Sequence, residues 1–262
     1  MGEHYSKKEL GKDMYQFFIE DENAAEDFVT IEGSDVNHIK NVLRMKPGEK
    51  IRVCTRNGQN YFCSISDITE SFVRADILEK EAESTELPCR IYLFQGLPKN
   101  DKMEWIIQKT VELGVYEVIP VAMKNCVVKL DDKKAKSKVT RWQAIAESAA
   151  KQSKRSLIPE VKMPMSYKEA VAYAKKLDVK LVPYENEHGM AGTKAAMEQI
   201  EKGESVAVFI GPEGGFAPEE IALVQDEMQL ISLGKRILRT ETAGIAALAI
   251  LGYQLESSDM IE

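Results

Sequence analysis

The chain has 262 residues, which suits one large domain or two modest ones at a usual size of about 100 to 200 residues each. With 44% hydrophobic and 29% charged residues, its composition is that of a globular protein and excludes collagen-like, coiled-coil and disordered chains. The net charge of −7 argues against a nucleic-acid partner, but residues 121–180 hold 15 Lys and Arg against 6 Asp and Glu. This local excess is either an electrostatic footprint for phosphates or a solvated basic loop that contains Lys133, Lys134, Lys136 and Lys138.

Other compositional features limit location and chemistry. The longest uncharged stretch, residues 242–255, is shorter than the roughly 20 residues that a bilayer requires, so it predicts a buried helix and no membrane partner. The first residues are charged and lack an apolar run, so we expect no secretory signal and a cytoplasmic protein. The cysteines lack CxxC spacing and the histidines are scattered, which predicts no metal site and free thiols at Cys54, Cys63, Cys89 and Cys126.

The first part of the chain has a β pattern. Residues 50–78 alternate between apolar and polar side chains around an Asn57-Gly58 turn, which predicts a β-meander. Ahead of it, a short helix is expected to start near Ser34 and to stop at Pro47-Gly48, with an apolar face of Val36, Ile39, Val42 and Leu43. The charged residues 79–85 mark a boundary near residue 85, which predicts domains at 1–85 and 86–262.

The second part alternates short apolar runs with helical patterns. Such alternation predicts an α/β domain with a parallel sheet covered on both faces, with strands near residues 91–97, 117–123, 180–185, 205–210 and 230–234. A helix over 102–113 is expected to turn Trp105, Ile106 and Val111 inward. A second helix over 139–155 groups the side chains of Trp142, Ile145, Ala146 and Ala149.

Two stretches after predicted strands carry candidate chemistry. The loop 211–216, GPEGGF, follows a strand and precedes a helix that opens at Pro218. Ligands of open α/β sheets bind beyond the carboxyl ends of strands, and glycines let the backbone approach them, although a plain turn also needs Gly and Pro. The stretch 232–243, SLGKRILRTETA, places arginines beside a buried helix, which indicates a site; alternatively Thr240 caps that helix.

Several segments together carry a family resemblance. The segments are GPEGG, SLGKRILRTETA, KMEWIIQKTVELGV, KQSKR and the N-terminal MYQFFIE with HIKNVLRMKPGE. They resemble the RsmE family of SPOUT-class RNA methyltransferases from Met14 onward, and residues 1–13 form an extension outside the match. The resemblance implies S-adenosyl-L-methionine-dependent methylation of N3 of a uridine in 16S ribosomal RNA, at position 1498. It also implies an N-terminal PUA-like β-barrel that binds RNA, a C-terminal SPOUT domain with a trefoil knot, a homodimer, and small-subunit RNA or the assembled 30S subunit as partner.

The resemblance also implies site residues. The cofactor cleft would be lined by Leu181, Pro183, Gly211, Glu213, Gly214, Gly215, Leu233, Gly234, Ile237, Leu238 and Arg239. Leu233, Ile237 and Leu238 would cover the faces of adenine. Methylation at N3 requires loss of a proton, for which Glu213 and Glu241 are candidate bases, and Arg239 could stabilise the resulting charge. Each carboxylate could instead be structural.

RNA contacts are expected at four positions. Arg44 closes the first helix, and Lys151, Gln152 and Arg155 share a polar helix face, although such faces are often merely solvated. The sequence departs from the family pattern at Gln16, where an arginine is usual, and at Lys151, where glutamate is usual.

Two other classes of protein compete with this interpretation. One is a non-catalytic RNA-binding or ribosome-assembly factor with a methyltransferase-like fold. The other is a class I methyltransferase or dehydrogenase on a Rossmann sheet, which is disfavoured because Gly114 closes a helix and no second glycine follows.

Overall fold

The computed structural model describes residues 14–81, 84–187 and 189–258, and the predicted extension 1–13 lies outside them. The described chain divides into two compact units. The first contains the residues up to Glu86 together with Ala150–Ile158, and the second contains Leu87–Ala149 and the residues from Pro159 onward. The division at Glu86 lies one residue from the boundary expected near 85. The return of Ala150–Ile158 to the first unit was not expected, because nothing in the composition of that segment marks it.

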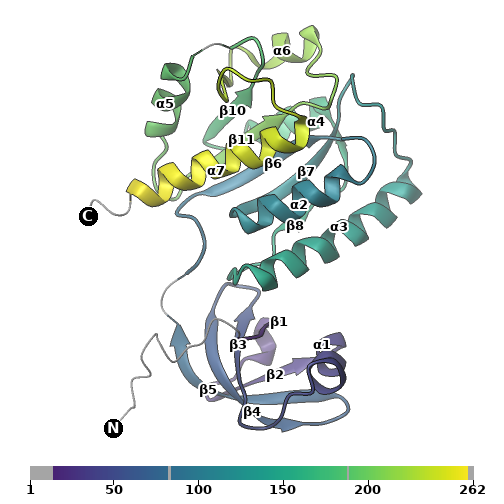
Figure 1. The fold of residues 1–262 in the computed structure, drawn as a ribbon, viewed down its shortest axis with the longest axis vertical. Helices are drawn as coiled ribbons and strands as arrows, with labels where there is room; N and C mark the ends of the chain where they lie inside the picture. The colour runs from purple at the N-terminus through teal and green to yellow at the C-terminus, as the bar shows by residue number, and fades with distance from the viewer. Residues whose placement is uncertain (1–13, 82–83, 188, 259–262) are drawn as a thin grey trace. The chain divides into compact units, whose positions relative to one another are not determined.

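The first unit is built on a five-stranded sheet in the order β1-β3-β4-β5-β2 (Figure 1). The strands are β1 (Gln16–Ile19), β2 (Phe28–Glu32), β3 (Lys50–Thr55), β4 (Asn60–Ile68) and β5 (Phe72–Glu81). β3, β4 and β5 pair antiparallel in succession, and Gly58 takes a φ of 84° in the turn between β3 and β4. The predicted meander and its Asn57-Gly58 turn are therefore confirmed.

The helix ahead of the meander starts at Ser34 as predicted, but it ends at Val42, before Pro47-Gly48, and one of its side chains is placed differently. α1 (Ser34–Asn37) continues as a π-helical turn, η2 (His38–Val42), in which the Leu43 amide donates to the carbonyl of His38, five residues back. The wider turn rotates Val42 away from the core, and its side chain is 61% exposed. The prediction that Val42 faces the core is therefore wrong, whereas Val36 and Ile39 are buried.

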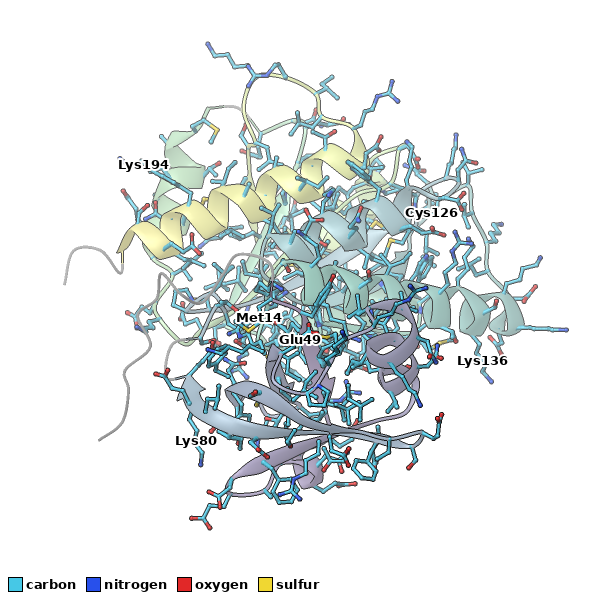
Figure 2. The ribbon with its side chains drawn as sticks, turned by 60° about the horizontal axis from the view of Figure 1, so that its bottom comes forward. Met14, Glu49, Lys80, Cys126, Lys136 and Lys194 are labelled. Atoms are coloured by element: carbon cyan, nitrogen blue, oxygen red, sulfur yellow. The ribbon has the colours of Figure 1, made fainter. Side chains whose placement is uncertain are left out.

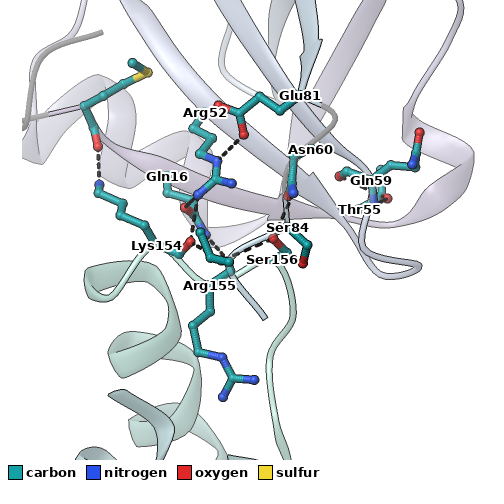
Figure 3. A network of polar contacts seen from close by, with 12 residues as sticks. Gln16, Arg52, Thr55, Gln59, Asn60, Glu81, Ser84, Lys154, Arg155 and Ser156 are labelled. Carbon is teal, nitrogen blue, oxygen red and sulfur yellow. Dashed lines mark hydrogen bonds and ion pairs between the residues drawn. The ribbon is translucent and has the colours of Figure 1, made fainter. Parts of the chain in front are cut away.

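The segment Ala150–Ile158 is held in the first unit by polar contacts to the sheet (Figure 3). Gln16 donates to the Arg155 carbonyl at 2.6 Å, and Arg52 donates to the Lys154 carbonyl at 2.7 Å. The Asn60 amide donates to the Ser156 hydroxyl at 2.8 Å. Gln16 is 4% exposed, so it contributes a buried structural hydrogen bond.

The second unit contains a parallel sheet in the order β12-β10-β11-β6-β7-β8, with β9 also paired to β7 (Figure 1). Its strands are β6 (Arg90–Gly96), β7 (Val115–Ala122), β8 (Glu160–Val161), β9 (Met165–Ser166), β10 (Val179–Pro183), β11 (Ser205–Ile210) and β12 (Gln229–Ile231). All of these pairs are parallel, and every residue of β11 is buried. The predicted parallel sheet is confirmed, and burial on both faces of β11 explains its uninterrupted apolar sequence.

The helices of the second unit are α2 (Lys102–Glu112), α3 (Asp132–Gln152), α4 (Tyr167–Ala174), α5 (Ala191–Glu198), α6 (Pro218–Val224) and α7 (Thr240–Ser258), and the last three residues of α3 belong to the first unit. Trp105 on α2 is 53% exposed beside Lys109, so its predicted inward orientation is wrong, whereas Ile106 and Val111 are buried. α3 begins seven residues earlier than predicted. Its first turns carry the run that was read as a loop, and Lys136 projects from them (Figure 2).

No helix in the described ranges is long and apolar enough to cross a membrane. The four cysteines are buried and unbonded, which confirms the prediction of free thiols.

Burial raises the pKa of both the Cys54 and the Cys63 thiol to about 12. Because the thiolate is the reactive form, we expect iodoacetamide to leave both thiols unmodified in the native protein at pH 8 and to alkylate them in denaturant. Mass spectrometry of peptides after timed labelling checks this. Rapid native labelling at either cysteine would contradict the burial described here.

Candidate active site

The candidate site lies at one edge of the parallel sheet in the second unit. β10, β11 and β12 are neighbouring parallel strands, so the residues that follow Pro183, Ile210 and Ile231 leave the sheet on the same side. The loops 211–216 and 232–239 are thereby brought to a shared edge. This is the edge at which open α/β sheets bind ligands.

A cavity of about 590 Å³ separates these loops. Its lining includes these residues named by the family resemblance: Pro183, Gly211, Glu213, Gly215, Leu233, Gly234, Ile237, Leu238 and Arg239. Pro212, Phe216 and Ser232 come from the two stretches that the sequence singled out, whereas it did not point to Lys102, Tyr184, Glu185 and Glu187. Two bends that are about 20 residues apart in sequence therefore line one cavity.

Three residues expected at the site are not in this lining. Leu181 is fully buried inside β10, because its side chain belongs to the core beneath the sheet edge. Gly214 is a packing position, since a Cβ there would lie 2.9 Å from Cβ of Asn125, whose amide donates to the Gly214 carbonyl. Glu241 sits on the first turn of α7, and its Oε2 lies 3.2 Å from Nζ of Lys102, which does line the cavity.

Backbone packing fixes the shape of the glycine loop. Gly96 ends β6 directly under the loop, and a Cβ there would lie 2.7 Å from the Pro212 nitrogen. Gly215 has a φ of 68°, which an L side chain rarely adopts. Glycine is therefore required at Gly96, which packs against the loop, and is favoured at Gly215 within the loop.

The Thr240 hydroxyl joins the two loops from below. It donates to the Gly211 carbonyl at 2.7 Å and accepts from the buried Gln95 amide at 2.9 Å. These contacts go beyond the helix cap that the sequence offered as an alternative for Thr240. The hydroxyl couples the end of β6, the glycine loop and the start of α7.

Lys102 bridges two carboxylates at the cavity. Its Nζ lies 3.1 Å from Glu213 Oε1 and 3.2 Å from Glu241 Oε2. Burial acts to raise the pKa of Glu213, but hydrogen bonds from the Lys99 amide and the Lys102 ammonium outweigh it and hold the pKa below its usual value. The hydrogen bond to Glu213 raises the pKa of Lys102. Glu213 and Lys102 therefore both stay charged near neutral pH.

Lys102 was missed because its helix was read only for its apolar face. A usable signal exists, however. Lys102 opens α2 six residues after β6 ends, and β6 pairs directly with β11. A cation in that position leaves the sheet at the same edge as the glycine loop.

The four positions expected to contact RNA belong to the first unit and differ in exposure. Arg44 and Gln152 are exposed. Lys151 pairs with Asp35 at 3.0 Å, and Arg155, beyond the end of α3, is 3% exposed and pairs with Glu86. The prediction that Arg155 shares an exposed polar face with Lys151 and Gln152 is wrong, because the helix ends before it.

Comparisons with known proteins agree with this architecture. A model described as an RNA methyltransferase domain matches residues 85–252, and one described as an RNA methyltransferase PUA domain matches residues 31–78. The Ribosomal RNA small subunit methyltransferase E of Bacillus subtilis (strain 168) is 39% identical over 231 residues, which cover 87% of this chain and 90% of that protein. A crystal structure of the protein with that name from Neisseria gonorrhoeae, bound to S-adenosyl methionine, has a TM-score of 0.79 and 32% identity and covers 91% of this chain and 96% of that one.

A PUA domain joined to a parallel α/β domain with a cavity at its strand ends defines a two-domain RNA methyltransferase. The RNA methyltransferase domain model matches more than half of the chain, which supports this class. The chain belongs to the ribosomal RNA small subunit methyltransferase E family. The resemblance found in the sequence is thus confirmed.

Proposed function

We propose that the protein transfers the methyl group of S-adenosyl-L-methionine to N3 of a uridine in 16S ribosomal RNA, at position 1498. The observation that carries this proposal is the cavity of about 590 Å³ between the loops 211–216 and 232–239. Relatives with the small-subunit methyltransferase name, one of them bound to S-adenosyl methionine, support the reaction and the cofactor. The RNA would be presented as small-subunit RNA or the assembled 30S subunit, in the cytoplasm.

The residues of the cavity suit this cofactor. The volume lies within the usual range of small-molecule sites. A Cβ at Gly211 would meet the Phe216 ring at 3.2 Å, a tight contact that glycine avoids. Leu233 and Leu238 are half-buried and can cover an apolar ring, while Glu185 and Glu187 provide carboxylates for an ammonium group. When bound, S-adenosyl-L-methionine supplies an electrophilic methyl group.

The chain's own residues must remove a proton, because N3 of neutral uracil is protonated. Glu213 is the weaker acceptor, since the Lys99 amide and Lys102 already hold its carboxylate. We assign it to holding the glycine loop in place. Among the ion pairs found in the described chain, Glu241 takes part in one, with Lys102. Because its carboxylate is held by fewer donors than that of Glu213, we assign Glu241 as the base, acting directly or through one water. Arg239, exposed at the cavity, would stabilise negative charge on the uracil oxygens.

Glu241→Gln separates these roles. We expect it to lower the single-turnover rate of methyl transfer to 30S subunits by roughly 10²-fold or more, with little effect on cofactor binding, because a positioned base contributes about that much. Glu213→Gln is the matched variant, and we expect it to weaken cofactor binding more than it lowers the rate. A Glu241→Gln enzyme that transfers methyl groups at the wild-type rate would remove Glu241 as the base.

The reaction is tested by mapping modified uridines in 16S RNA from a strain that lacks the gene. We expect the loss of one N3-methyluridine and its return when the purified protein and S-adenosyl-L-methionine are added to the isolated subunits. An unchanged map would remove the target assignment. A non-catalytic RNA-binding or assembly factor would bind the subunits and restore nothing.

We also propose that the enzyme acts as a homodimer and that the second unit carries the trefoil knot expected of the SPOUT class. The dimer is supported by α7, which carries apolar side chains around its circumference and leaves Tyr253 75% exposed. Sedimentation at micromolar concentration tests the association.

A further inference from the structure

An exposed apolar side chain stands beside two cations at the rim of the cavity. Ile237 is 87% exposed, the highest value among the large hydrophobic side chains of the described chain. Lys235 and Arg236 directly precede it and are also exposed, and neither side chain forms an ion pair with any described residue.

Ile237 lines the cavity, as the family resemblance implied, but most of its side chain is exposed in the structure. Leu233 and Leu238, which also line the cavity, are half-buried. Nearly all of the Ile237 side chain instead faces solvent, where an apolar group gains nothing unless a partner covers it.

Charges of opposite sign lie on two of the segments that line the cavity. Lys235 and Arg236 lie on the loop 232–239, whereas Glu185 and Glu187 lie on the segment that follows β10. A polyanion is attracted to the loop 232–239 and repelled by the segment after β10. This division of charge favours a path over residues 235–237 for an RNA strand that delivers a base to the cavity.

The loop is anchored at both ends, which leaves its tip to meet a ligand. At one end Ser232 exchanges hydrogen bonds with the Thr193 hydroxyl at 2.9 and 3.0 Å. At the other, the Thr240 hydroxyl donates to the Gly211 carbonyl. Ile237 is β-branched and stiff at χ1, so it can be presented as a rigid apolar group.

We propose that Lys235 and Arg236 bind the phosphates that flank the target uridine and that Ile237 fills the space which this uridine leaves in the base stack. The inference rests on the proposed function, since a base that is methylated in a cavity must leave its stack. Proteins that deform nucleic acids commonly insert an apolar side chain between bases and flank it with Arg or Lys.

The two roles predict different kinetics on 30S subunits from a strain that lacks the gene. Ile237→Ala should lower kcat about tenfold or more and leave KM within about twofold, because the space it fills exists only once the base has left the stack. Ile237→Leu should retain most of the activity. Lys235→Ala and Arg236→Ala should each raise KM and reduce the slope of log affinity against log salt by about 0.7 to 0.9.

Matched controls lie outside the cavity. Leu223→Ala removes an apolar side chain of α6 that is 47% exposed, and Lys194→Ala removes a cation on α5 (Figure 2). Neither should change kcat or KM. All of these side chains are at the surface, so the variants should fold as the wild type does.

Calorimetry with S-adenosyl-L-methionine completes the test. We expect Ile237→Ala to bind the cofactor within about twofold of the wild type. Weakened cofactor binding with unchanged kcat would assign Ile237 to adenine and overturn the proposal. Unchanged cofactor binding together with unchanged kcat would also overturn it. A wild-type protein that methylates no subunit RNA would instead overturn the proposed function itself, and this inference with it.

Discussion

Gly96→Ala is expected to weaken binding of S-adenosyl-L-methionine by about 100-fold or more. A Cβ at Gly96 would lie 2.7 Å from the Pro212 nitrogen, 2.9 Å from Pro212 Cδ and 3.1 Å from the Gly211 carbonyl carbon. These are backbone and ring atoms, which cannot rotate away as the end of a long side chain can. The glycine loop must move as a whole, and a displacement of about 1 Å in a positioned site can cost about 10²-fold.

The matched control is Gly192→Ala on α5, where a Cβ would meet nothing within 4 Å. It should leave cofactor binding unchanged and stabilise α5 by up to about 1 kcal/mol, because alanine is the better helix former. Isothermal titration calorimetry of the wild type and both variants measures the effect. Wild-type affinity in Gly96→Ala would mean that the glycine loop does not bind the cofactor.

Arg155→Ala should lower the free energy of unfolding of the first unit by about 3 to 5 kcal/mol. Arg155 is 3% exposed, and its Nε lies 3.1 Å from Glu86 Oε2, while Glu86 Oε1 accepts from the Ser156 amide at 2.8 Å. Removal of the guanidinium leaves Glu86 partly buried without its cation. That penalty exceeds the value of the ion pair itself.

Hydrogen exchange of the β3 and β4 amides in the first unit measures this opening free energy. Lys175→Ala is the control, because its ion pair with Glu227 is half-exposed and should contribute about 0 to 1 kcal/mol. Arg155→Met combined with Glu86→Leu should recover much of the loss, since an apolar pair leaves no buried charge. If Arg155→Ala exchanges as the wild type does, the segment 150–158 is not anchored by this pair.

The sequence predicted elements where local physics decides them. The Asn57-Gly58 turn needs positive φ, and the uninterrupted apolar run of β11 needs burial on both faces, and each feature is visible in a short window. The loops 211–216 and 232–239 were found because parallel strands end at one edge. Their shared cavity follows from that rule once the strand order β12-β10-β11 is known.

The errors have two physical causes, namely partners that are distant in sequence and a local change of helix type. Arg155 was read as part of a polar helix face, but its conformation is set by Glu86, 69 residues away. Lys102 was missed, and its partners Glu213 and Glu241 lie on other elements. Val42 was displaced by a π-helical turn that composition does not announce.

A crystal structure of the full-length protein soaked with S-adenosyl-L-methionine tests the central claim most directly. Density for the donor is expected between residues 211–215 and 233–239, with its methyl group directed toward the side of the cavity that holds Arg239. Density at another place in the chain, or none at saturating concentration, would contradict the claim that these two loops form the binding site for the methyl donor.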